Sequence, residues 1–233
     1  MKWLFKYVVL ILTIILWANT SQSQNRQRQK SLDHRFEITF ISGVNLSQID
    51  GDFFTGFDLV GLNAGLQVEA LIIPRIALTV GMMYSQKGAK TPHGTIVSVQ
   101  SSNDRTLRLN YIEIPILFKS MLDHRDSGPF IEIGGSIGRL SSTKIIEKKT
   151  TQRGGTIYSM VVSEFKNSEI NAVAGLGFTI GKRFAFSFRY IYGFTKFYND
   201  PDFFPGTAFS TITKEVEFLR NYNIAFLLSY RIL

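Results

Sequence analysis

Three histidines and a group of aspartates are the residues of this chain that come closest to a chemical site. His34, His93 and His124 lie far apart, and the chain has no cysteine, which excludes thiolate zinc sites and thiol nucleophiles. His93 shares the segment "KTPHGTIVSVQSSNDR" with several serines and Asp104. A serine hydrolase places a histidine beside its nucleophile, but no spacing in this segment singles out such a pair. The sequence therefore predicts no enzymatic activity.

The segment "DGDFFTGFD" brings Asp50, Asp52 and Asp58 next to two glycines. Carboxylates this close together are suitable ligands for Ca²⁺. Their order does not follow an EF-hand loop, and acidic, glycine-rich loops are common without a metal. Calcium is therefore a weak candidate, and no cofactor is predicted.

Most of the chain alternates between large apolar residues and small or polar ones. The stretch "RFAFSFRYIYGFTKF", residues 183–197, carries aromatic rings at every even position from Phe184 to Phe194. A period of two is typical of a β-strand whose two faces differ. Seven of eight predicted strands place apolar side chains on even numbers, and the fifth places them on odd numbers. The predicted strands span approximately residues 35–49, 60–73, 76–88, 106–121, 129–148, 156–181, 183–198 and 211–233.

The connections between these strands are alternately short and long. The short turns are at residues 74–75, 123–128 and 181–182, and the long connections are at 50–59, 89–105, 150–155 and 199–210. An even number of strands with short turns at one end and long loops at the other is typical of a bacterial outer-membrane barrel. The predicted fold is an all-β, eight-stranded antiparallel up-and-down transmembrane barrel in the outer membrane.

The face opposite the apolar one is rich in glycine, serine, threonine and asparagine. A soluble barrel of the lipocalin type, which is the alternative, would instead expose many long charged side chains to water. Small residues suit the narrow lumen of an eight-stranded barrel, with the aromatic rings facing lipid. Tyrosines near the strand ends would then form girdles at the membrane interfaces.

A few long charged side chains fall on the predicted lumen face. Charges of both signs in a confined space can satisfy one another. We expect Glu37 to pair with Arg231 where the last strand closes onto the first, and Glu113 to pair with Arg189 across the lumen. The candidate charge network comprises Glu37, Glu69, Glu113, Glu132, Arg189 and Arg231, and Lys87 and Lys119 lie on the same face.

The N-terminal residues have the layout of a secretory signal peptide. Two lysines precede a short apolar run, which is followed by small and polar residues up to Ser23. A retained transmembrane anchor is the alternative, but the run is shorter than the roughly 20 residues that a spanning helix needs. The predicted organisation is a signal peptide at 1–23, a polar leader at 24–34 and the barrel at 35–233.

The formal net charge is +8, and 13% of the residues are aromatic. The basic residues are scattered, so no nucleic-acid partner is predicted. Attraction to anionic lipid or to surface glycans fits this charge better.

Two adjacent segments carry a family resemblance. "LNYIEIPILFKSML" (109–122), followed by "GPFIEIGGSIGRL" (128–140), resembles the PorT-like outer-membrane β-barrel family, and "VEALIIPRIALTVGMMYSQKGAK" (68–90) is similar to its second hairpin. The resemblance implies an eight-stranded barrel in the outer membrane of Gram-negative bacteria. One namesake is associated with protein secretion, and most members have no assigned role. Pro115 lies in mid-strand without an amide donor, so it needs a bulge or a locally unpaired position.

Apolar rings also occur in the long connections, where they are candidates for contact with a partner or for a cap over the barrel. We expect a non-catalytic structural or interaction protein whose partners are membrane lipid and a protein of the envelope or secretion machinery. The alternative is a narrow pore for small solutes. The candidate contact residues are Phe53, Phe54, Phe57, Phe203, Phe204 and Phe209.

Overall fold

The computed structural model describes residues 36–51, 56–90, 105–123, 127–147, 165–199 and 218–232. All regular elements within these ranges are strands, and no helix there is long and apolar enough to cross a bilayer. The strands are β1 (Phe36–Asp50), β2 (Leu59–Ile73), β3 (Ile76–Lys90), β4 (Arg105–Met121), β5 (Gly128–Glu147), β6 (Ser168–Ile180), β7 (Phe184–Gly193), β8 (Tyr198–Asn199) and β9 (Phe218–Arg231).

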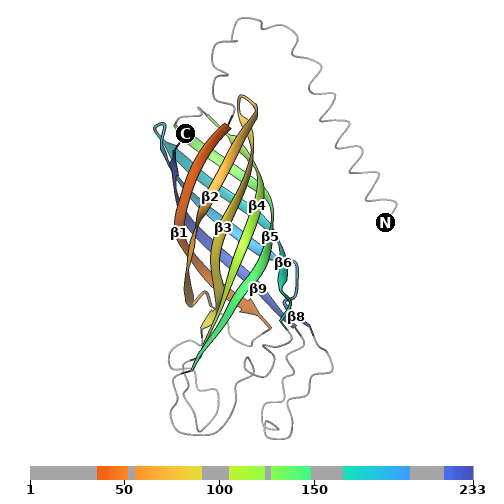
Figure 1. The fold of residues 1–233 in the computed structure, drawn as a ribbon. Coiled ribbons are helices and arrows are strands. Elements are labelled where there is room, and N and C mark those ends of the chain that lie inside the picture. The colour runs from red at the N-terminus through yellow and green to blue at the C-terminus, as the bar shows by residue number, and fades with distance from the viewer. Residues whose placement is uncertain are drawn as a thin grey trace, which may run out of the picture. The chain divides into compact units, whose positions relative to one another are not determined.

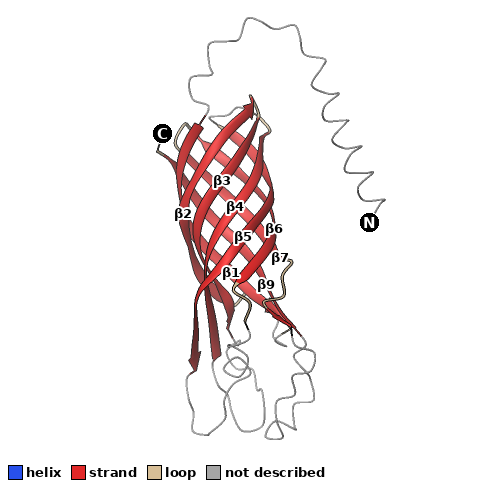
Figure 2. Cartoon of the chain, turned by 45° about the vertical axis from the view of Figure 1, so that its right-hand side comes forward, coloured by secondary structure: helices blue, strands red, loops and turns tan. Residues whose placement is uncertain are grey.

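Eight of these strands form a closed antiparallel barrel (Figures 1 and 2). Strands β1 to β7 pair in chain order, β9 follows β7, and β9 also pairs with β1. Val44, for example, lies opposite Phe226 at this closing seam. Closure gives each of the eight strands a partner on both sides, which a bilayer requires because it offers no water to unpaired backbone groups. The predicted eight-stranded antiparallel up-and-down barrel is therefore confirmed.

The barrel wall has one apolar outer face and one inner face, as the alternation predicts. The neighbours Met82 and Met83 show this directly, since Met82 is 65% exposed and Met83 only 3%. On β1 the outward apolar residues run from Phe36 to Leu46, with Gln48 beyond. A rise of about 3.3 Å per residue and a tilt of about 40° give this stretch a height of about 25 Å, which matches the apolar band of membrane barrels.

The predicted boundaries are wrong at the long-loop ends of β6 and β7. Phe165 to Asn167 lie within the predicted strand 156–181 but precede β6, because Leu140 N–H donates to the Asn167 carbonyl and Lys166 N–H to that of Phe197. Strand β7 ends at Gly193, and the short β8 then rejoins β9. The predicted starts of the sixth and eighth strands, at 156 and 211, lie outside the described residues.

Pro115 occupies a locally unpaired position, one of the two arrangements that its missing amide donor predicts. The pairing of β3 with β4 passes from Val80–Ile116 to Met83–Glu113 with an unchanged register, while Pro115 pairs with Ser136 on β5. The side without a ladder partner is therefore the one toward β3.

Candidate functional site

The side chains inside the barrel form four successive layers. We call the barrel end with the short connections the turn end, and the other the loop end. From the turn end, the interior passes through a polar layer, an apolar layer, a second polar layer and a second apolar layer. On β1 these are represented by Glu37, Ile41, Asn45 and Ile49 in that order.

The first layer, which we call the turn-end chamber, contains three ion pairs. Arg231 Nε lies 2.7 Å from Glu37 Oε2, which is the pair expected at the closing seam. Lys119 Nζ lies 2.8 Å from Glu69 Oε2. The three pairs balance their charges one to one, and the third is the pair between Glu132 and Arg189.

Arg189 donates two parallel hydrogen bonds to Glu132. Its Nε donates to Oε2 at 2.7 Å and its Nη2 to Oε1 at 3.1 Å, a bidentate geometry that holds both side chains in one orientation. The Arg189 stem crosses Gly175, where a Cβ atom would lie 3.0 Å from the Arg189 Cγ. A Cβ atom at that position would require the Arg189 stem to shift by a few tenths of an ångström.

The turn-end chamber encloses a cavity of about 30 Å³. Four buried polar atoms without a protein partner belong to its lining residues, namely Gln67 Nε2, Glu69 Oε1, Thr79 Oγ1 and Ser187 Oγ. One water molecule needs about 10–15 Å³ of such space and two or more polar neighbours. The chamber is therefore suited to ordered water that completes the hydrogen bonding of its ion pairs.

The second layer, the inner apolar layer, crosses the barrel above this chamber. Its members are Ile41, Met83, Leu117, Val173, Ile191, Ala225 and Leu227. They come from β1, β3, β4, β6, β7 and β9, so the layer reaches around most of the wall. These apolar side chains, all but Ala225 large, occupy odd positions on the face that the sequence predicts to be small and polar.

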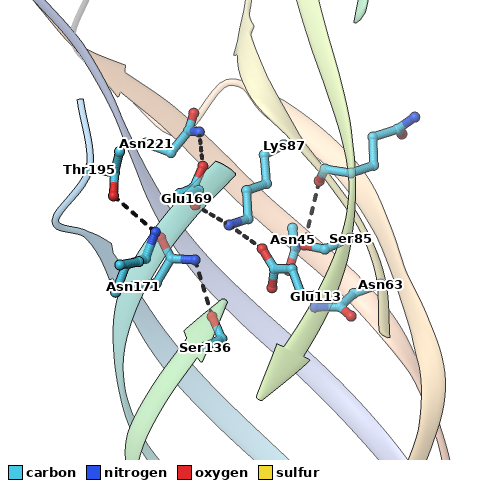
Figure 3. Close-up of polar contacts among 12 residues, drawn as sticks. Asn45, Asn63, Ser85, Lys87, Glu113, Ser136, Glu169, Asn171, Thr195 and Asn221 are labelled. Carbon is cyan, nitrogen blue, oxygen red and sulfur yellow. Dashed lines mark hydrogen bonds and ion pairs between the residues drawn. The ribbon is translucent and has the colours of Figure 1, made fainter. Parts of the chain in front are cut away.

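The third layer, the buried polar network, is built around Lys87 (Figure 3). Lys87 is fully buried and its Nζ contacts the carboxylates of both Glu113 and Glu169, the latter at 2.6 Å. Asn221 Nδ2 donates to the second oxygen of Glu169 at 2.6 Å. The ring of Tyr111 lies under the ammonium, with its centroid 5.2 Å from Nζ. One buried cation thus holds two buried carboxylates together.

Amide and hydroxyl groups extend this network to the neighbouring strands. Asn63 Nδ2 donates to Asn45 Oδ1 at 3.0 Å, and Asn45 Nδ2 donates to Ser85 Oγ at 3.0 Å. Asn171 Nδ2 donates to Ser136 Oγ at 3.1 Å. These groups come from β1, β2, β3, β5 and β6, so polar contacts at this level link several strands of the wall (Figure 3).

The fourth layer, the outer apolar layer, closes the loop end of the described barrel. The rings of Phe165 and Phe197 meet edge to face, with centroids 5.1 Å apart. The remaining members are Ile49, Ala89, Leu107, Leu109, Tyr111, Tyr198 and Leu219, with Leu140 and Ile145 packed against them. Sequence reasoning missed this layer, although the odd-numbered leucines of β4 were its visible signal.

The predicted pair of Glu113 with Arg189 is wrong. Arg189 pairs with Glu132, and Glu113 pairs with Lys87, so the two residues belong to different layers. Glu169 was missed altogether. It occupies an odd position of β6 like Asn171 on the same inner face, so the alternation itself was the signal that could have found it.

The other predicted site residues are only partly placed. Asp50 accepts a hydrogen bond from the Tyr222 hydroxyl at 3.0 Å, and Asp58 is exposed before β2. Asp52, which would complete the calcium candidate, lies outside the described residues, and within those residues no group of three or more potential ligands is suitable for a metal ion. Phe57 is half-buried, while Phe53, Phe54, Phe203, Phe204 and Phe209 lie outside the described ranges, as do the three histidines.

Residues 21–199 match the family described as outer membrane protein beta-barrel domain. The chain belongs to this family. As an outer-membrane β-barrel protein it lies in the outer membrane, with apolar side chains such as Phe36, Met82 and Phe186 facing lipid. In such barrels short turns face the periplasm and long loops face the exterior. The turn end of this barrel is therefore periplasmic, and the loop end is extracellular.

Several solved outer-membrane proteins are similar to this chain. Ail of Yersinia pestis, the attachment invasion locus protein, matches with a TM-score of 0.43 and 11% identity over 85% of this chain and 100% of its own. OprG of Pseudomonas aeruginosa matches with a TM-score of 0.39 and 9% identity over 84% and 95%. Neisserial surface protein A matches with a TM-score of 0.39 and 10% identity over 85% and 98%. A comparison with curated proteins gives no match.

Proposed function

We propose that this protein is a non-catalytic structural or interaction protein of the outer membrane that acts through its extracellular loops. The observation that carries this proposal is the filling of the lumen. The inner and outer apolar layers both cross the described barrel, and the buried polar network lies between them. A barrel whose interior is occupied in this way has its loops and outer wall left for contact with other molecules.

The same layers count against the narrow pore that the sequence left open as an alternative. A solute path needs polar groups and water along the whole axis, whereas here two apolar layers interrupt it. The cavity of the turn-end chamber lies on the periplasmic side of both layers. Its volume of about 30 Å³ suits water rather than a larger solute.

The partner that we propose is a protein of the envelope or secretion machinery. The PorT-like resemblance of residues 68–140 supports this choice, since one namesake of that family is associated with secretion. The aromatic residues of the first and last long connections support a protein contact, because aromatic side chains are enriched where proteins meet. The connections that join β1 to β2 and β8 to β9 leave the barrel on either side of the closing seam.

Mild cross-linking of intact outer membranes followed by purification of the barrel tests this proposal. The wild-type protein should capture a defined partner, and replacing Phe203 and Phe204 by serine should abolish the capture. The matched control is Leu122→Ser, which removes an exposed apolar side chain from a periplasmic turn and should leave the capture intact. Identical captured proteins for the loop variant and the wild type would contradict the proposal, and so would no specific partner at all.

A further inference from the structure

A row of basic residues lies on the outer wall of the barrel, where β3, β4 and β5 leave the apolar band at the extracellular end. Ile112 on β4 and Ile137 on β5 are exposed isoleucines of the band there, and Ile146 is exposed farther out on β5. Arg139 follows directly on β5, and Arg108, Lys144 and Lys90 lie farther out. Their strands are adjacent (Figure 2), so these side chains share one surface. We call Arg108, Arg139, Lys144 and Lys90 the basic rim.

Within the described residues, no acidic side chain neutralises the basic rim. Arg108 lies directly opposite Lys144 in the ladder, an arrangement of like charges that destabilises a sheet. Within the described part of the chain, Arg108 Nη1 makes a long hydrogen bond of 3.4 Å to Gln86 Oε1, and its Nε is buried without a partner there. Among the described outward-facing residues of β3, β4 and β5 above Ile112 none is acidic. An anion from outside the chain would remove this repulsion.

The opposite side of the extracellular rim shows a different arrangement. Arg220 on β9 lies directly across from Asp50 on β1, and its Nη1 donates to the Tyr192 hydroxyl. Tyr222 donates to Asp50 in turn. Arg220 therefore lies in a group that contains the acidic Asp50 and the two tyrosines Tyr192 and Tyr222. Among the described residues, the basic rim has no comparable acidic partner.

The position of the basic rim limits what the anion can be. Arg139 is exposed and follows only two residues after the lipid-facing Ile137, so its head lies at the level of the outer-leaflet headgroups. A molecule that contacts both residues needs acyl chains beside the isoleucines and negative charge beside the arginines. Guanidinium groups bind phosphate through paired hydrogen bonds, and lysines add attraction.

We propose that the basic rim is a binding site for a phosphorylated glycolipid of the outer leaflet, with the phosphates held by Arg108, Arg139 and Lys144. The lipid would lie on the outer wall over β4 and β5. Its phosphates would bridge Arg108 and Lys144, which lie opposite each other. Lys90, at the far edge, would contact the sugar portion. This assignment is independent of the protein partner proposed above, because it concerns the wall and not the loops.

The test is native mass spectrometry of the refolded full barrel in detergent with added diphosphoryl lipid A. The triple variant Arg108→Gln, Arg139→Gln, Lys144→Gln should raise the dissociation constant at least about tenfold, because each surface cation contributes to the attraction. The matched control removes three exposed cations from the periplasmic turns, by Arg75→Gln, Lys182→Gln and Arg183→Gln. This control should change the dissociation constant by less than about threefold. Monophosphoryl lipid A should bind the wild type more weakly than the diphosphoryl form.

Three results would overturn the proposal. The first is wild-type affinity in the extracellular triple variant. The second is an equal loss in both triple variants, which would indicate diffuse attraction by net charge. The third is equally tight binding of a heparin fragment without acyl chains, which would indicate a soluble glycan instead. The substituted side chains lie on the surface, and the folded state of each variant can be verified by its far-UV circular dichroism.

Discussion

The two polar layers of the lumen compensate their buried charges in different ways. The turn-end chamber pairs its charges one to one, around a cavity that water can fill. The buried polar network instead shares one lysine between two carboxylates and lies between two apolar layers. A charge that loses its partner can be hydrated in the chamber but not in the network. The comparison therefore predicts that the network is the more sensitive of the two.

Removing the central cation should have the largest effect. Lys87→Met leaves the Glu113 and Glu169 carboxylates facing each other without compensation, and should lower the free energy of unfolding by about 3–5 kcal/mol. Urea unfolding of the barrel in lipid vesicles, followed by circular dichroism, measures this loss. The triple variant Lys87→Met, Glu113→Gln, Glu169→Gln should recover most of it, since the repulsion is gone. A cost below about 1 kcal/mol for Lys87→Met would show that water reaches the network.

The pairing inside the chamber should appear as a smaller but specific coupling. A double-mutant cycle of Glu132→Gln with Arg189→Gln should give a coupling energy of about 1 kcal/mol or more, because the two side chains share a bidentate contact. The cycle of Glu113→Gln with Arg189→Gln should give less than about 0.5 kcal/mol, because these residues lie in different layers. Equal coupling in the two cycles would contradict the layer assignment.

Chemical labelling should reveal the difference in hydration between the turn-end chamber and the buried polar network without a measurement of stability. The chain has no cysteine, so single cysteines report cleanly. Thr39→Cys lines the cavity of the chamber and should react with a small water-soluble methanethiosulfonate, whereas Ser85→Cys in the network should not. Both should react in urea. Comparable rates in the folded barrel would remove the distinction between the two polar layers.

The sequence predicted which face a side chain occupies far better than which layer it belongs to. Alternation placed Glu113 and Arg189 on the inner face correctly, but it carries no information on height along the axis. Height depends on the stagger between neighbouring strands. Lys87 is opposite Leu109 in the ladder and yet reaches Glu113, because the strands are tilted. That stagger becomes visible only when the barrel is closed.

The alternation of apolar and polar residues also did not predict where the chain bends at the loop end. The aromatic pattern of residues 183–197 continues to Phe194, but the chain leaves the ladder after Gly193. Both Phe194 N–H and Thr195 N–H then point to the Ile170 carbonyl, and Phe197 turns inward to join the outer apolar layer. These contacts join residues far apart in sequence, so no local sequence pattern predicts them.

Planar-bilayer recording of the refolded barrel tests the central claim most directly, namely that its interior is filled. The inner and outer apolar layers predict that insertion of the folded protein produces no sustained ionic current under an applied voltage. A steady, reproducible single-channel conductance from correctly folded protein would contradict the filled lumen and would restore the narrow pore.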